Sequence, residues 1–212
     1  MIIAVDGPAA SGKGTIARGL AKRYNLPHLD TGLLYRAVAA NIMRLELDPE
    51  READAVAACD FDELLLADNA LRDDATGRVA SIVSAHPLVR ASLLMRQRRF
   101  AQQPGGAVLD GRDIGTVIAP DADAKLFIKA TPSIRAKRRH AELRERGSTL
   151  SLDRVLADIR SRDLRDTSRS VAPLIQTPGA GVLDTSFLSV DASIQRAIEL
   201  VERQRSLRAE TR

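Results

Sequence analysis

The stretch Ile2 to Thr15, IIAVDGPAASGKGT, decides the fold. Its first part, 2–5, is a short run of apolar and mostly β-branched residues, which is typical of a strand buried on both faces. Apolar residues recur at helical spacing over 13–24, and the Pro27 region ends that pattern. The order strand, glycine-rich turn, helix predicts the start of an α/β domain with a parallel sheet.

Within this stretch, 7–13 has the form of a phosphate-binding loop, in which two glycines bracket four residues and a lysine follows. Such glycines let successive backbone N–H groups converge on an anion at a helix N-terminus, and Lys13 then reaches the β and γ phosphates. A purely structural glycine turn is the alternative. Gly14 stands where a Ser or Thr usually contacts Mg²⁺, with Thr15 one residue later, so direct magnesium coordination by the loop stays open. The predicted nucleotide site comprises Gly7, Pro8, Ala9, Ala10, Ser11, Gly12, Lys13, Gly14 and Thr15.

Strands and helices alternate along the rest of the chain. We expect strands at 107–110, 125–128 and 182–184, and helices at 33–45, 51–58, 87–101, 134–146, 151–163 and after the capping residue Ser189. Segments 64–66 and 69–71 indicate a small hairpin, and 164–170 indicates a loop rich in Arg and Asp. This alternation predicts a three-layer α/β/α architecture with a parallel central sheet.

Composition excludes several classes of protein. The 212 residues allow one domain, and no run approaches the roughly 18 uncharged apolar residues that a membrane helix requires. Aromatic residues make up only 3% of the chain, which argues against a nucleic-acid binder that stacks bases. A single cysteine, Cys59, excludes an internal disulfide, and we expect a buried thiol in a cytoplasmic protein. We expect no membrane or nucleic-acid partner, and a monomer.

Four segments rich in arginine could form a second anion site: 31–36, 81–90, 110–113 and 162–169. Each alone would be interpreted as a set of surface salt bridges. Together they indicate a site for a phosphorylated second substrate. Three histidines, His28, His86 and His140, stand in no acid–base or metal-ligand pattern, so structural roles are expected for them.

These segments resemble the bacterial cytidylate kinases, P-loop kinases of nucleoside monophosphates. The shared motifs are Gly-Pro in a loop ending Gly-Lys-Gly-Thr, Leu-Asp-Thr-Gly before Tyr-Arg, Asp-Gly-Arg-Asp before Gly-Thr-Val, and Arg-Asp-x-Arg-Asp before Val-Ala-Pro-Leu. They occur in the same order over essentially the whole chain. The resemblance implies transfer of the γ-phosphoryl group of ATP, with Mg²⁺, to CMP or dCMP. It also implies a core of approximately 1–30, 102–134 and 166–212, a monophosphate-binding lobe at 31–101 and a lid at 135–165.

The resemblance further implies roles for individual residues. The acceptor phosphate would be bound by Arg36, Arg112 and Arg169. The cytosine edge would be recognised by Ser81, Arg90 and Asp113. The ribose would be bound by Arg162 and Asp166, and the substrate set is completed by Thr31 and Tyr35. The catalytic set would be Lys13, Arg112 and Arg169. Candidates for lid contacts to the ATP phosphates are Arg135, Arg138 and Arg139.

One departure from the longer bacterial cytidylate kinases concerns the monophosphate-binding lobe. Those kinases carry an inserted small sheet there, whereas the stretch 61–79 is short in this chain, so we expect a reduced hairpin. Two other functions remain open. The chain could phosphorylate a different small acceptor, such as UMP, AMP or shikimate, or it could be a nucleotide-binding regulator without kinase activity.

Overall fold

The computed structural model describes residues 1–210 and contains two compact units. One unit comprises Met1–Leu29 with Arg98–Arg212, and the other comprises Asp30–Gln97. Each unit is described by itself below. None of the helices in residues 1–210 has the length and apolar composition needed to cross a lipid bilayer.

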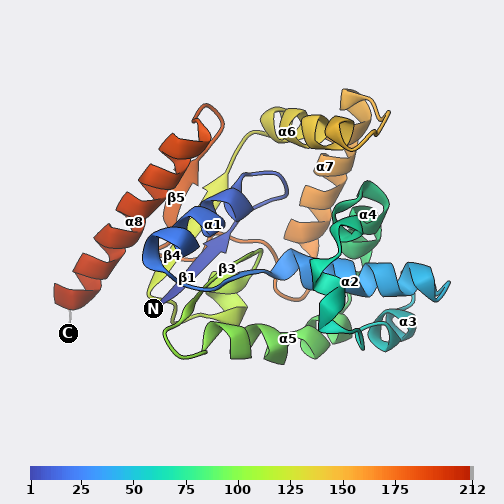
Figure 1. Ribbon diagram of the computed structural model, residues 1–212, viewed down its shortest axis with the longest axis horizontal. Helices are drawn as coiled ribbons and strands as arrows, with labels where there is room; N and C mark the ends of the chain where they lie inside the picture. Colours follow the sequence, from blue (N-terminus) through green and yellow to red (C-terminus); the bar gives the residue numbers. More distant parts are fainter. Residues whose placement is uncertain (211–212) are drawn as a thin grey trace. The chain divides into compact units, whose positions relative to one another are not determined.

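A five-stranded sheet forms the centre of the first unit (Figure 1). The strands stand in the order β2-β3-β1-β4-β5, and β1 pairs in parallel with both β3 and β4, while β4 pairs in parallel with β5. As the apolar run predicted, β1 is the middle strand, and Ile3, Ala4 and Val5 are fully buried. The strand bounds are Ile2–Asp6 (β1), His28–Asp30 (β2), Ala107–Gly111 (β3), Ala124–Lys129 (β4) and Gly181–Asp184 (β5).

Helices flank this sheet, so the predicted α/β/α architecture is confirmed. The helices α1 (Lys13–Tyr24) and α8 (Val190–Glu210) pack against each other and against the strands. Their buried residues, among them Leu20 and Val201, join the strand side chains in one apolar core. A single turn of π-helix, η3 (Ile114–Ile118), packs on β1.

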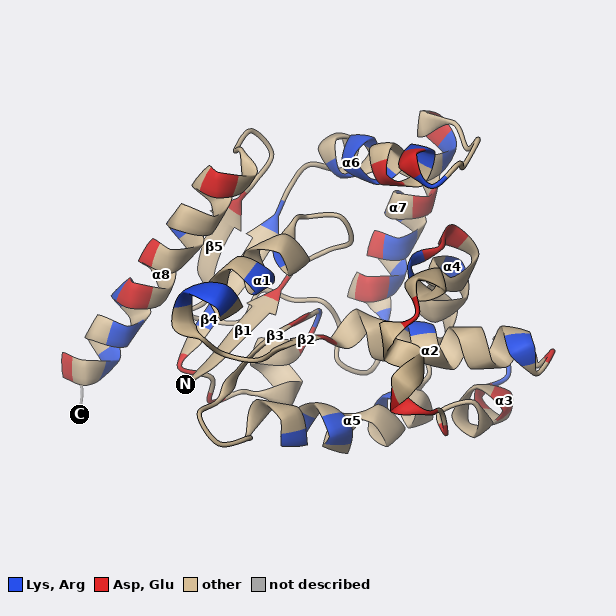
Figure 2. Ribbon diagram, viewed as in Figure 1, with Lys and Arg blue, Asp and Glu red and all other residues tan. Residues whose placement is uncertain are grey.

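Two helices follow β4 and pack on each other: α6 (Pro132–Glu145) and α7 (Leu152–Ser168). Their contact is a small apolar cluster of Ala136, Leu143, Val155 and Ile159. Acidic and basic residues alternate along the rest of α7 (Figure 2). Partly exposed pairs at helical spacing, such as Arg154 with Asp158 at 3.5 Å, are compatible with this solvated face.

The second unit is built from helices. Its elements are α2 (Thr31–Arg44), α3 (Glu52–Ala57), the 3₁₀ turns η1 (Glu63–Ala67) and η2 (Asn69–Arg72), α4 (Asp74–Val83) and most of α5 (Pro87–Ala101). The helices α2 and α4 pack closely, and Leu34, Val38, Leu71 and Val83 are buried. The bounds of α5 agree with the prediction, because Pro87 begins the helix.

The predicted hairpin at 64–71 is wrong, because two 3₁₀ turns occupy this segment. Asp62 accepts a hydrogen bond from Leu64 N at 2.9 Å, and Asp68 accepts one from Ala70 N at 2.8 Å. These side-chain caps start local turns in place of a strand pair. The strand β2 and the π-helical turn η3 fill segments for which no structure was predicted, and α4 begins within 61–79, where a reduced hairpin was expected.

Two further expectations need correction. The predicted loop at 164–170 is helical to Ser168, since α7 continues past the expected end at 163. Here Asp166 is buried in ion pairs, and this tertiary contact stabilises a turn whose composition alone suggested a loop. Cys59 is half-buried rather than fully buried; its Sγ donates to Ala55 O at 3.4 Å, and burial raises the pKa of the thiol.

Candidate active site

The loop between β1 and α1 is shaped to leave its main chain open to an anion. A side chain at Gly7 would overlap the carbonyl oxygen of Ile128, so only glycine fits where the loop leaves the sheet. Gly12, with φ of 89°, precedes α1 in the left-handed region and makes no side-chain cap. The first turn of α1 contains no acidic residue. Backbone N–H groups at the positive end of α1 are thus suited to binding phosphate.

Ser11 lies at the centre of this loop and is fully buried. Its Oγ has no hydrogen-bond partner among residues 1–210, which leaves a buried hydroxyl within the anion cradle. Its carbonyl oxygen accepts from Thr185 Oγ1 at 2.8 Å and from Arg138 Nη1 at 3.4 Å. Thr185 follows β5, so the loop is attached to the far edge of the sheet.

The three arginines of α6 that were predicted to contact the ATP phosphates have different surroundings. Arg138 donates to Thr185 Oγ1 at 3.0 Å and to Thr185 O at 2.6 Å. Arg135 is buried and forms a bidentate pair with Asp163 of α7, at 2.8 and 2.6 Å, and also donates to Ala9 O at 3.3 Å. Arg139 donates to the exposed Glu142 at 3.2 Å. Two of the three expected lid arginines therefore contact the backbone of the phosphate-binding loop.

An acidic residue also lies beside the loop. Asp110, on β3, has Oδ2 3.7 Å from the position a Cβ would take at Gly14, and its Oδ1 lies 2.8 Å from His28 Nε2. No group of three His, Cys, Asp or Glu side chains within residues 1–210 is arranged to hold a metal ion. These donors fit Mg²⁺ that is carried mainly by phosphate and water, with at most one or two protein oxygens as ligands.

A second cluster of charges lies where β3 and α7 end. Arg112 Nε donates to Asp166 Oδ2 at 2.7 Å, and Arg169 Nη1 lies 3.9 Å from Asp166 Oδ1. Arg169 Nη2 lies 3.7 Å from Asp113 Oδ1, and Arg169 Nε donates to Ala172 O at 2.6 Å. The side chains of Asp113, Asp166 and Arg169 are each less than 10% exposed. Two arginines and two carboxylates are thus held together in a nearly buried network.

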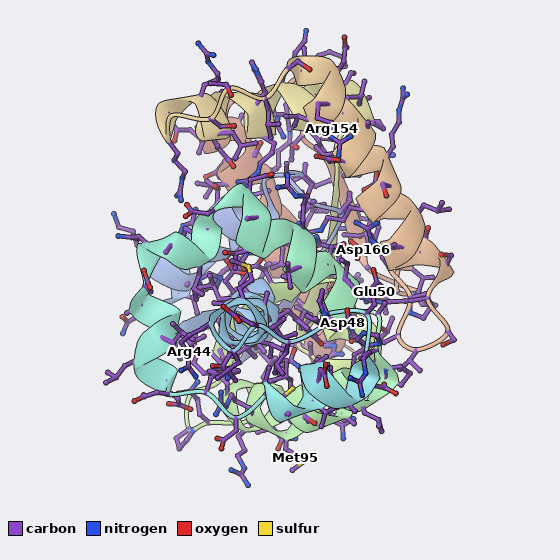
Figure 3. All side chains as sticks on the ribbon, turned by 90° about the vertical axis from the view of Figure 1, so that its right-hand side faces the viewer. Arg44, Asp48, Glu50, Met95, Arg154 and Asp166 are labelled. Carbon is purple, nitrogen blue, oxygen red and sulfur yellow. The ribbon has the colours of Figure 1, made fainter. Side chains whose placement is uncertain are left out.

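The pKa of Asp166 reports the field in this cluster. Burial alone would raise it, but the charges of Arg112 and Arg162 and the hydrogen bond from Arg112 lower it to about 2. Asp166 and Arg154 lie toward opposite ends of α7 (Figure 3). Arg162 is one helical turn before Asp166. The first unit therefore brings together the five predicted residues of the segments 110–113 and 162–169, which are Arg112, Asp113, Arg162, Asp166 and Arg169.

In the second unit, the predicted substrate-binding residues lie on α2, α4 and α5. Thr31, the first residue of α2, is buried, and Asp30 caps this helix by accepting from Gly32 N at 3.1 Å. Arg36 donates to Leu71 O at 2.5 Å and to Asp73 O at 3.1 Å. Its guanidinium lies so close to Gly77 that a Cβ there would approach Nη2 to 2.8 Å. Arg36 is thereby placed between α2 and α4.

Tyr35, Ser81 and Arg90 come from α2, α4 and α5 and are all buried. The Arg90 guanidinium carbon lies 5.5 Å from the centre of the Tyr35 ring, and Arg90 Nη1 donates to Ser84 O at 3.2 Å. Ser84 Oγ in turn donates to Ser81 O at 3.1 Å. All five predicted substrate residues of this unit are thus held by packing or hydrogen bonds at the contacts of its helices.

Sequence reasoning missed three residues that the structure places beside these clusters: Asp6, Asp110 and Thr185. Asp6 ends β1, and Asp110 is the next-to-last residue of the neighbouring strand β3. Carboxylates near the carboxyl ends of neighbouring parallel strands are a signal that could have been found in the sequence. Thr185 carried no such signal, because its contact with Ser11 depends on how β4 and β5 pair. His86 Nε2 donates to Pro49 O at 2.8 Å, and His140 Nε2 donates to Leu150 O at 3.1 Å.

The parallel sheet, the phosphate-binding loop and the clustered arginines define a kinase of the P-loop class. In fold, the chain is similar to the solved structure of a gluconokinase from Sinorhizobium meliloti, with a TM-score of 0.55 and 14% identity over 99% of this chain and 95% of that one. The model of the cytidylate kinase family matches residues 3–203, and the chain belongs to this family.

Two relatives match the chain over nearly its full length. A protein named cytidylate kinase from Xanthobacter autotrophicus is 54% identical over 206 residues, which cover 97% of this chain and 99% of the relative. Another of that name, from Nitrobacter winogradskyi, is 52% identical over 212 residues, covering 99% of this chain and 100% of the relative. The chain is an ATP-dependent nucleoside monophosphate kinase.

Proposed function

We propose that this chain transfers the γ-phosphoryl group of ATP to CMP or dCMP, which yields CDP or dCDP and ADP. The observation that carries the proposal is that one unit holds both a main-chain phosphate cradle at 7–15 and a nearly buried cluster of Arg112, Asp113, Asp166 and Arg169. The cradle suits the triphosphate of the donor, and the arginines suit the acceptor phosphate.

In this proposal ATP binds to the backbone of 7–15, with Lys13 on its β and γ phosphates. The acceptor phosphate is bound by Arg36, Arg112 and Arg169. The ribose is bound by Arg162 and Asp166. The base is recognised by Ser81, Arg90 and Asp113, and the acceptor is further contacted by Thr31 and Tyr35. The catalytic residues are Lys13, Arg112 and Arg169.

No side chain needs to act as a general base in this reaction. The attacking atom is an anionic oxygen of CMP phosphate, so the protein mainly positions the two nucleotides and neutralises charge. Lys13 and the arginines are permanent cations that serve this purpose. This agrees with the histidines' contacts, which are to Asp110 and to backbone carbonyl oxygens.

Discrimination between cytosine and uracil follows from hydrogen-bond polarity. Cytosine presents an amino donor beside a ring-nitrogen acceptor, whereas uracil presents a carbonyl beside an N–H. A carboxylate and an arginine, here Asp113 and Arg90, therefore complement cytosine alone. Uracil would leave buried partners unpaired at a cost of about 1–3 kcal/mol each, so UMP should be a poor substrate.

Magnesium is part of the proposal. When bound, Mg²⁺ supplies charge neutralisation on the transferred phosphoryl group. The residues that would contact it, directly or through water, are Thr15 and Asp110, because both carry oxygen donors at the loop. We assign the monophosphate-binding lobe to residues 31–101 and the lid to 135–165. We also propose a cytoplasmic monomer.

The proposal is tested by an assay of ADP release with Mg-ATP and CMP, dCMP, UMP, AMP or no acceptor. We expect turnover with CMP and dCMP, little with UMP, and only slow ATP hydrolysis without an acceptor. Equal or faster turnover of UMP or AMP would contradict the choice of acceptor. Turnover that does not depend on any acceptor would contradict phosphoryl transfer as such.

A further inference from the structure

Asp6, the last residue of β1, holds a segment of backbone far from it in sequence. Its side chain is buried, and both carboxylate oxygens are engaged: Oδ1 accepts from Ile114 N and Oδ2 from Gly115 N, each at 2.8 Å. Gly7, the first residue of the phosphate-binding loop, follows directly in the chain. The main chain of Asp6 therefore continues directly into the phosphate-binding loop, whereas its side chain holds the backbone at Ile114 and Gly115.

The segment that Asp6 holds is the π-helical turn η3, which follows Asp113. Asp113 O accepts from Val117 N at 2.9 Å and from Ile118 N at 3.2 Å. The two N–H groups at the start of such a turn have no partner within it, and the Asp6 carboxylate satisfies both. The backbone that carries the Asp113 side chain is thus fixed from one side by its own turn and from the other by Asp6.

Only a carboxylate has the right polarity for this contact. It offers two acceptor oxygens, whereas an amide would turn an N–H₂ donor toward one of the two backbone donors. Gly115 allows the close approach, because a Cβ at that position would lie 3.3 Å from Asp6 Oδ2 and 3.0 Å from Thr177 Oγ1. The pair Asp6 and Gly115 is accordingly matched in both chemistry and shape.

Burial of the Asp6 carboxylate disfavours its charged form. Burial raises the pKa of Asp6 to about 6, although the two backbone hydrogen bonds and the charge of Arg112 act in the opposite direction and Asp113 adds to the rise. A buried charge that destabilises the fold is commonly found where a functional site requires it.

We propose that Asp6 is a positioning residue for the acceptor nucleotide: its carboxylate sets the orientation of Arg112 and Asp113 and so controls the affinity and base selectivity for CMP, but not the binding of ATP. This inference rests on the proposed function, because it takes Arg112 and Asp113 to contact CMP. The main chain of Asp6 is held separately by its register with Gly111 and Phe127 on the neighbouring strands, so a side-chain change leaves the phosphate-binding loop in place.

The test is Asp6→Asn, measured by steady-state kinetics with each substrate varied in turn. We expect kcat/KM for CMP to fall about tenfold or more, as is common when a binding group is displaced by a fraction of an ångström. We expect KM for ATP to stay within about twofold, and the ratio of CMP to UMP turnover to fall. The matched control is Asp123→Asn, at the opposite end of β1, where Oδ2 accepts from Ile2 N at 2.7 Å. This control should leave both KM values unchanged.

A second variant, Gly115→Ala, disturbs the same contact from the other side and keeps the test decisive if Asp6→Asn does not fold. The same selective loss for CMP is expected, and Asp6→Glu should recover less than half of the wild-type value because its longer side chain displaces the turn. Equal changes in KM for ATP and CMP, or an unchanged CMP to UMP ratio in a folded variant, would overturn the inference. If the wild-type protein does not phosphorylate CMP, the proposed function fails instead, so the two failures are distinguishable.

Discussion

Nε of Arg112 donates to Oδ2 of Asp166 at 2.7 Å, and this ion pair joins the end of β3 to the last turns of α7. The side chains are 13% and 5% exposed, so the pair is largely removed from water. Removal of one partner from a buried pair leaves an uncompensated charge, which is more harmful than removal of both.

Asp166→Asn should therefore lower the free energy of unfolding at neutral pH by about 3 kcal/mol. The pKa of Asp166 is lowered from 3.8 to about 2, so its contribution is present above pH 4 and is lost as the pH falls toward 2. The difference between wild type and variant should shrink over that window. Urea unfolding at pH 7 and at pH 2.5 measures it, with Asp158→Asn, at a partly exposed position of the same helix, as the control. If the difference in the free energy of unfolding between wild type and variant did not depend on pH, the stabilising role of the ionised Asp166 would be contradicted.

Lys13→Ala should abolish turnover and leave the fold intact. Lys13 begins α1 at the anion cradle, and its loss removes a cation from the transferred phosphoryl group. We expect kcat to fall at least about 100-fold. Circular dichroism and ADP release give the two measurements, and Lys22→Ala in the last turn of the same helix is the control. A rate near that of the wild type would refute the role of Lys13.

Asp113→Asn should relax the choice between CMP and UMP. The amide can donate to the uracil carbonyl where the carboxylate cannot, so the selectivity ratio should fall about tenfold or more. Competition between the two nucleotides in one reaction measures this ratio directly. Asp184→Asn, an exposed carboxylate at the end of β5, provides a control for the loss of one negative charge. An unchanged ratio would remove Asp113 from base recognition.

Arg138→Ala should raise KM for ATP more than KM for CMP. The substitution removes three hydrogen bonds that attach Thr185 and Ser11 O to α6. The Ser11 carbonyl would then keep only the hydrogen bond from the Thr185 hydroxyl, and Arg135 would still donate to Ala9 O. We expect KM for ATP to rise about fivefold or more, since one such bond is worth about 1 kcal/mol. The neighbouring exposed residue gives the control Lys137→Ala. Equal KM values for wild type and variant would show that Arg138 does not support the loop.

Those parts of the fold that depend on local patterns could be predicted. The run 2–5 is typical of a buried strand, the glycines of 7–12 indicate a turn, and Pro87 starts a helix whose length the sequence also indicates. The segments 64–71 and 164–168 could not be assigned in this way. Short polar and apolar stretches fit several local structures, and the choice was made by the Asp62 and Asp68 caps and by the burial of Asp166.

The same distinction applies to the candidate site. Lys13 was predicted from the phosphate-binding loop motif, whereas Arg112 and Arg169 were predicted from the resemblance to the cytidylate kinases. The structure puts Arg112 and Arg169 into one charge network with Asp166. Asp6 and Thr185 were not predicted, because what each does depends on partners more than 100 residues away in the sequence. Only strand register brings such partners together.

The bidentate pair between Arg135 and Asp163 has a mechanical consequence. It joins the first turn of α6 to the second-last turn of α7, and Arg135 Nε also donates to Ala130 O, just before the start of α6, at 2.9 Å. The ion pair and the apolar cluster between α6 and α7 fix the angle at which these two helices pack. If the proposed lid closes over a bound nucleotide, α6 and α7 should therefore rotate together as one rigid body. Its pivots then lie in the flanking links, near Thr131 on one side and near Ala172, with φ of 50°, on the other.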